Sequence, residues 1–175
     1  MSDNTAAAAA EVPGKVAGLA ITAIVLIVIV AWIALWIGAL KFTDTTLVGG
    51  FMLLWYWANN EAMDIKRLPA AIIGALVGVF LAWFVVYATI SWGTNGTIAG
   101  LLLMVVALYL DVIKAVPLVV NTSTMLFLTL AAAPLIQLKV NWTELALSVV
   151  IGGIFFGVVI EGLKRLTAMR AGAPQ

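Results

Sequence analysis

Four adjacent polar side chains interrupt an apolar stretch that runs from residue 117 to residue 134 and has a proline at each end. The four are Asn121, Thr122, Ser123 and Thr124. Their amide and hydroxyl groups need hydrogen-bond partners, which hydrocarbon does not offer. We expect a local break in a helix, with these groups lining a path for a polar solute. The alternative is structural: Ser and Thr bond to carbonyl groups one turn earlier, and Asn bonds to a neighbouring helix.

A counterpart lies in the first half of the chain. Gly49 and Gly50 stand near the start of a short apolar run, and Asn59 follows its end. Gly permits a non-helical turn or the close approach of another backbone. We therefore expect these three residues to contribute to the same solute lining, with close helix packing as the alternative for the glycines.

Asp111 and Lys114 lie three residues apart near the end of another apolar segment, and hence on one helix face. Ionisable groups within a membrane suggest ion or proton coupling, so the pair could supply coupling charges. A simple ion pair at the membrane edge explains the same spacing.

Enzymatic chemistry finds no support in the residue types. Cys and His do not occur in the 175 residues, which disfavours thiolate chemistry, zinc sites and His-ligated cofactors. Neither a nucleophile paired with a base nor a phosphate-binding loop stands out. We expect a protein that is not an enzyme and needs neither a cofactor nor a metal. A net charge of +1 without a basic patch also predicts no nucleic-acid partner.

The composition is that of an integral membrane protein. Hydrophobic residues make up 65% of the chain and charged residues 10%, with a mean hydropathy of +1.18. Charged residues account for about 25% of soluble domains. The sequence thus predicts an all-α fold with the lipid bilayer as its main partner.

Six apolar segments predict six transmembrane helices. They are residues 16–40, 47–58, 68–90, 98–116, 117–134 and 143–163, with a turn-rich loop over 91–97. The second would reach only about 18 Å as a helix, and the fifth is the interrupted stretch. Asn141 and Glu144 resemble a capping box before the last segment. We expect one transmembrane domain over residues 15–170, between mobile cytoplasmic tails at 1–14 and 171–175.

Charge fixes the expected orientation. With six crossings, seven of the nine Lys and Arg residues fall on one side of the membrane and two on the other. If the second and fifth segments only dipped into the membrane, the division would be four against five. Cytoplasmic loops carry the excess of Lys and Arg, so we expect six crossings with both termini in the cytoplasm.

The two halves of the domain, residues 15–92 and 97–166, follow the same plan: a long segment, a short or interrupted one, and a segment with two spaced glycines. An offset of 79 superposes Gly74 on Gly153 and Gly78 on Gly157. Because each half has three crossings, the halves would be inverted, as in many transporters. We expect the glycine pairs themselves to serve helix packing.

The chain resembles the DUF1097 family of small bacterial inner-membrane proteins. The resemblance rests on the short aromatic segment at residues 49–58, the Gly-rich third segment, the interrupted fifth segment ending near 131–133 and the closing stretch 150–157. It implies a bacterial inner membrane and supplies no catalytic residues.

Together these patterns predict a channel or secondary transporter for a small, uncharged polar solute, acting as a homo-oligomer or within a membrane complex. The alternative from a different class is an accessory subunit that packs against a larger membrane complex and transports nothing.

Overall fold

The computed structural model describes residues 15–133 and 140–171, and the elements in those ranges are all helical. Their order is α1 (Lys15–Ile33), the π-helical segment η1 (Ala34–Ala39), the 3-10 turn η2 (Asp44–Thr46), α2 (Val48–Asn60), α3 (Leu68–Val112), α4 (Thr122–Ala131) and α6 (Trp142–Ala171). The all-α prediction is confirmed. The expected tails lie outside the described residues, apart from Ala171, which ends α6.

Helix α3 is a hairpin of two helical arms. Its 45 residues would reach about 68 Å if straight, roughly twice the thickness of a bilayer core. Gly93 breaks the helix with φ 58° and ψ −136°, a conformation open to glycine. The first arm (residues 68–92) and the second arm (residues 94–112) then run antiparallel. Gly96 lies so close to the carbonyl of Ala88 that a side chain there would overlap it.

This hairpin is tighter than the sequence predicts. A loop was expected over residues 91–97, but only Gly93 leaves helical geometry, and the helix continues on both sides. The hydroxyl groups of Thr89 and Thr97 lie 3.1 Å apart across the two arms. Gly93 and Gly96 therefore let the two arms of α3 meet without a loop between them.

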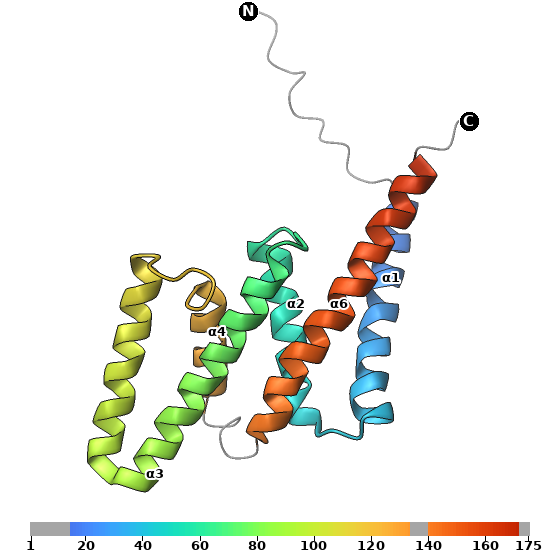
Figure 1. Cartoon of the computed structure of the whole chain (residues 1–175). Helices are drawn as coiled ribbons and strands as arrows, with labels where there is room; N and C mark the ends of the chain where they lie inside the picture. The colour runs from blue at the N-terminus through green and yellow to red at the C-terminus, as the bar shows by residue number, and fades with distance from the viewer. Residues whose placement is uncertain (1–14, 134–139, 172–175) are drawn as a thin grey trace, which may run out of the picture.

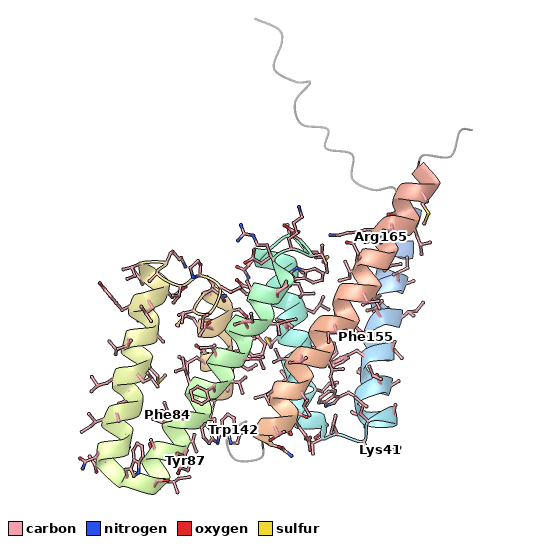
Figure 2. The ribbon with its side chains drawn as sticks, viewed as in Figure 1. Lys41, Phe84, Tyr87, Trp142, Phe155 and Arg165 are labelled. Atoms are coloured by element: carbon pink, nitrogen blue, oxygen red, sulfur yellow. The ribbon has the colours of Figure 1, made fainter. Side chains whose placement is uncertain are left out.

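Successive segments run in alternating directions (Figure 1). Helix α1 lies at one edge of the molecule and the second arm of α3 at the other, with α6, α2, the first arm of α3 and α4 between them. Lys41, after η1, and Arg165, near the end of α6, mark opposite ends of the molecule (Figure 2).

The described ranges do not contain six full-length transmembrane helices. Two helices, α3 and the part of α6 from Trp142 to Thr167, are long and apolar enough to cross a membrane. Helices α2 and α4 have 13 and 10 residues, whereas a span requires about 20. The second and fifth segments are thus short, as the sequence indicates, but the prediction of six transmembrane helices is not borne out in the described residues, where two helices are long enough.

The apolar core lies where α2, the first arm of α3, α4 and α6 meet. Each contributes a side chain that is at most 1% exposed: Leu53, Ala75, Phe127 and Val149. A smaller aromatic cluster joins α1 and η1 to α6 through Trp32, Trp36 and Phe156.

Each short helix packs on a long helix from the other half of the chain. The start of α4 lies over Gly74 and Gly78 of α3, and the start of α2 lies over Ser148 and Gly152 of α6. A methyl group on Gly78 would overlap the backbone of α4, so glycine is needed there. The short helices can approach this closely only because small residues face them.

The register of these contacts differs from the one read in the sequence. The contacted residues in α3 and α6 are 74 positions apart in both pairs, not 79. Gly153 and Gly157, matched by the offset of 79, lie against the apolar side chains of Ile72 and Leu68 instead. The contacts agree with the expected role of the glycines in helix packing. They do not agree with the pairing of residues at an offset of 79.

Candidate functional site

The four adjacent polar residues mark the start of α4 and not a break within a helix. Asn121 has extended geometry and is the N-cap, and its Oδ1 accepts hydrogen bonds from the backbone N–H groups of Ser123 at 3.0 Å and Thr124 at 3.4 Å. The Thr124 hydroxyl accepts from the Asn121 N–H at 3.1 Å in return. This reciprocal pair satisfies N–H groups that the first turn of any helix leaves unpaired.

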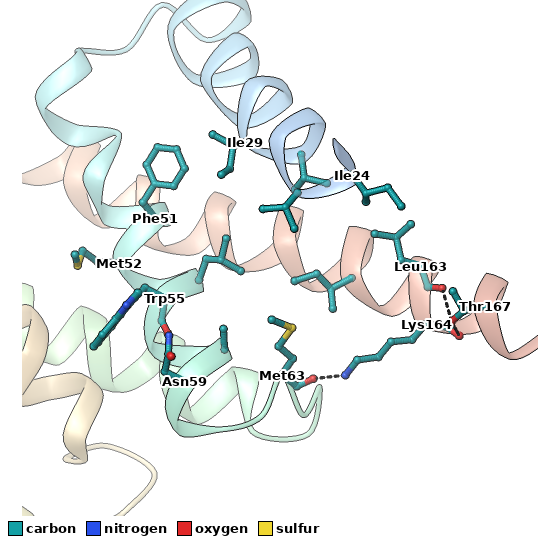
Figure 3. A pocket seen from close by; sticks show the side chains of 15 residues that line it. Ile24, Ile29, Phe51, Met52, Trp55, Asn59, Met63, Leu163, Lys164 and Thr167 are labelled. Atoms are coloured by element: carbon teal, nitrogen blue, oxygen red, sulfur yellow. Dashed lines mark hydrogen bonds between the residues drawn. The ribbon is translucent and has the colours of Figure 1, made fainter. Parts of the chain in front are cut away.

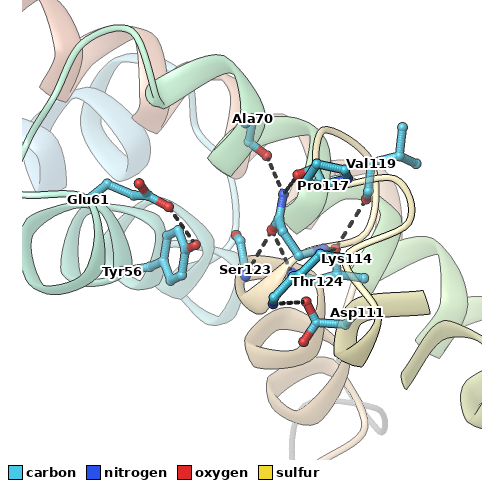
Figure 4. Close-up of polar contacts among 10 residues, drawn as sticks. Tyr56, Glu61, Ala70, Asp111, Lys114, Pro117, Val119, Ser123 and Thr124 are labelled. Atoms are coloured by element: carbon cyan, nitrogen blue, oxygen red, sulfur yellow. Dashed lines mark hydrogen bonds and ion pairs between the residues drawn. The ribbon is translucent and has the colours of Figure 1, made fainter. Parts of the chain in front are cut away.

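The side chains of Asn121, Ser123 and Thr124 also donate to nearby backbone carbonyl groups (Figure 4). Asn121 Nδ2 donates to the carbonyl oxygen of Ala70 at 3.0 Å, and the Ser123 hydroxyl donates to that of Ala71 at 2.9 Å. Ser123 and Thr124 are fully buried, whereas Thr122 is exposed. The geometry matches the structural alternative, and a role in lining a solute path stays a prediction.

Gly49 and Gly50 are buried against α6 at the first turn of α2. The Gly50 N–H donates to the Ser148 hydroxyl at 2.9 Å, so α6 supplies the acceptor that the start of α2 lacks. A methyl group on Gly50 would overlap the ring of Trp32. Both glycines therefore serve close packing.

Asn59 lies at the other end of α2, about 15 Å from the glycines at 1.5 Å per residue. Its Nδ2 donates to the Trp55 carbonyl at 2.8 Å, and its side chain is exposed. The structure thus does not gather the expected lining residues, because those of α2 lie at opposite ends and those of α4 lie against α3.

Asp111 and Lys114 form an ion pair of 2.8 Å at the end of α3. The Lys114 side chain is 60% exposed, so water screens the pair and its contribution is small, about 0–1 kcal/mol. The geometry agrees with the alternative given for this spacing, a simple ion pair.

A polar cluster missed by sequence reasoning joins the loop after η1 to the start of α6. Glu144 Oε2 accepts from the Thr43 hydroxyl at 2.6 Å and from the Thr43 N–H at 2.9 Å. Trp36 Nε1 donates to the buried Thr46 hydroxyl at 3.1 Å. Asn141 caps α6 as expected, and its amide donates to Glu144 Oε1 at 2.9 Å. In the sequence, the Thr-rich loop is the signal that indicates this cluster, because Thr43 and Glu144 are about a hundred residues apart.

A groove between α1, α2 and α6, with a volume of about 760 Å³, is open to a ligand (Figure 3). We call it the α1 groove. Its lining is almost wholly apolar along its length and includes Ile24, Val25, Val28, Phe51, Leu54, Trp55, Ala58 and Ile160.

Polar groups meet the α1 groove at one end. Asn59, Lys164 and Thr167 lie there, beside Met63 (Figure 3). Lys164 Nζ donates to the Met63 carbonyl at 2.7 Å. Of the expected solute-lining residues, Asn59 belongs to this groove, which the sequence pattern did not reveal because three distant helices form it.

Comparison with known protein families, curated proteins and solved structures gave no match. The resemblance to the DUF1097 family therefore stays a prediction, and function has to be inferred from the geometry of this chain.

Proposed function

We propose that the protein is a multi-pass membrane protein that binds a membrane-dissolved amphiphile, with the apolar portion held in the α1 groove. The observation that carries this proposal is the α1 groove itself. Its volume of about 760 Å³ lies within the 300–1,000 Å³ of typical ligand sites. An apolar interior with polar groups at one end suits a ligand of the same make-up.

A bilayer setting is supported by the surface of the outermost segments. Ile27 on α1 is 67% exposed, and Leu102 and Val105 on the second arm of α3 are each 61% exposed. Contiguous apolar faces of this kind are unfavourable in water. The short helices α2 and α4 are compatible with a bilayer because α6 and α3 supply hydrogen-bond partners at the start of each.

The proposed orientation of the protein in the membrane follows from the distribution of Lys residues between the two ends of the molecule. Lys66, Lys114 and Lys164 lie at the end where α2 stops, and Lys41 lies at the other. The excess of positive charge favours a cytoplasmic location for the first end, and for the polar end of the α1 groove with it.

An inverted repeat also belongs to this proposal. Helix α2 packs on α6, and α4 packs on the first arm of α3, so the second and fifth segments take equivalent places. They run in opposite directions, as halves of opposite orientation require (Figure 1). Repeats of this design are common in carriers, which favours movement of the ligand between leaflets over its storage.

The ligand proposed here differs from the small polar solute expected from the sequence. Of the four polar residues that suggested such a solute, Asn121, Ser123 and Thr124 donate hydrogen bonds to the protein's own backbone. Passage of a small solute stays a prediction.

Tryptophan fluorescence tests the proposal, since Trp55 lines the α1 groove. A long-chain monoglyceride with a brominated chain, titrated into the protein in detergent micelles, should quench fluorescence saturably. Val25→Phe narrows the groove and should weaken this binding severalfold.

The matched control is Val105→Phe, an exposed valine on the second arm of α3. It should bind as the wild type does, and Trp55→Phe should remove the saturable component. Equal binding by the Val25 and Val105 variants would contradict the proposal.

An accessory subunit is the second candidate, and a row of aromatic rings on α3 favours it. The row comprises Phe80, Trp83, Phe84, Tyr87 and Trp92, with neighbouring ring centroids 5.3–6.4 Å apart. Phe80 and Trp92 are more than half exposed, and aromatic residues are enriched where proteins meet. Copurification of a defined larger partner, lost in Phe80→Ala, would support this role.

A further inference from the structure

We infer that the ligand of the α1 groove is an anionic phospholipid of the cytoplasmic leaflet, with one acyl chain in the groove and its phosphate at Lys164. This inference rests on the proposed function, because the same groove holds the chain. Its own support comes from the charges at the groove end.

Lys164 belongs to the lining of the α1 groove, and its known partner is neutral. An ammonium group has three N–H donors, and one of them reaches the Met63 carbonyl at 2.7 Å. Within residues 15–133 and 140–171, no carboxylate lies within ion-pair distance of it. Its full charge is therefore open to an anion that enters the groove.

The loop after α2 holds Lys164 in place. Ala62 and Met63 have φ of 48° and 56°, a left-handed conformation that non-glycine residues seldom adopt. This conformation turns the Met63 carbonyl toward Lys164 while the Met63 side chain remains part of the groove lining (Figure 3). The loop thus fixes the cation where the apolar lining ends.

Other charges around this end leave the balance positive. Its charged residues are Glu61, Asp64, Lys66, Arg67, Glu161, Lys164 and Arg165. Glu161 pairs with Arg165 at 3.0 Å, Glu61 accepts from the Tyr56 hydroxyl at 3.0 Å, and Asp64 accepts from the Lys66 N–H at 2.9 Å. The carboxylates are thus engaged within the protein, whereas Lys164 meets only a carbonyl.

A phospholipid fits this arrangement of charge and apolar surface. Its phosphate lies at the depth where basic residues end a helix, and its chain enters hydrocarbon. Basic pockets between helices on the cytoplasmic side are suited to anionic head groups. The Asn59 amide at the same end uses one N–H on the Trp55 carbonyl and keeps a second N–H for the head group.

The test compares brominated phosphatidylglycerol with brominated phosphatidylcholine of the same chains, by quenching of Trp55 in detergent micelles. The wild type should bind phosphatidylglycerol about fivefold more tightly. Val25→Phe should weaken binding of both lipids severalfold, whereas Lys164→Gln should abolish the preference for phosphatidylglycerol. Lys164→Arg should restore most of it.

Lys114→Gln is the matched control, since it removes the same charge from the same side but far from the α1 groove. It should keep the preference. An equal loss in the Lys114 and Lys164 variants would overturn the inference in favour of general surface charge. So would a wild type without preference, and in both cases monoglyceride binding sensitive to Val25→Phe would leave the proposed function standing. Loss of that sensitivity would overturn both.

Discussion

At the scale of single residues, the polar side chains at the start of α4 show how buried polar atoms are satisfied in an apolar chain. Asn121 bonds to its own helix through Oδ1 and to the backbone of α3 through Nδ2. Gly74 makes room for it, because a methyl group there would overlap the amide. Asn121, which suggests a solute path in the sequence, thus links α4 to α3 by hydrogen bonds.

Asn121→Ala should destabilise the protein by about 1–2 kcal/mol, because it removes the cap of α4. The midpoint of unfolding in detergent, followed by circular dichroism, measures the change. Thr122→Ala is the control: Thr122 is exposed, and its loss should cost less than about 0.5 kcal/mol. Equal effects of the two substitutions would contradict the assigned role.

At the scale of helices, the short ones depend on glycine in the long ones. Helix α4 has only 10 residues, too few to be stable alone in water. It is held by capping and by close contact with the first arm of α3, where Gly78 meets its backbone. The close packing of α4 on α3 therefore depends on glycine at position 78.

Gly78→Ala should separate α4 from α3 and destabilise the fold by about 1–3 kcal/mol. Gly162→Ala is the control, because Gly162 lies in α6 with open space around it. Alanine favours a helix by up to about 1 kcal/mol over glycine, so this variant should be neutral or more stable. Thermal unfolding in detergent compares the two, and a Gly78 variant as stable as the Gly162 variant would refute the contact.

The sequence predicts a structural feature well where its interaction partners are close in the chain, and poorly where they are far apart in the chain. The all-α fold, the short second and fifth segments and the cap at Asn141 follow from local patterns. The bonds from Gly50 to Ser148 and from Thr43 to Glu144 join residues 98 and 101 positions apart. Nothing in a helical pattern indicates which long helix a short one meets.

At the scale of the whole molecule, the alternating direction of the segments gives the proposed topology its physical basis. Successive segments run in alternating directions, the two arms of α3 included (Figure 1). Segments that only dipped into the membrane would return to the side they left. Sidedness of the loops therefore distinguishes the two arrangements.

Because the chain has no natural cysteine, single Cys substitutions can report that sidedness directly. In sealed vesicles of known orientation, an impermeant thiol reagent should label Lys66→Cys only from the cytoplasmic face. It should label Lys41→Cys only from the opposite face. Labelling of both from one face would refute the proposed orientation.

The pairing of α2 with α6 also has a consequence for synthesis of the protein. Helix α4 meets the first arm of α3, which the ribosome has already made, so it can pack as soon as it emerges. Helix α2 is followed by more than eighty residues before α6 exists to accept the Gly50 N–H and cover Gly49. Until α6 has been synthesised, the face of α2 that packs on it stays uncovered. A chain truncated before residue 142 should therefore be a substrate for quality-control proteases, although it retains five of its six segments.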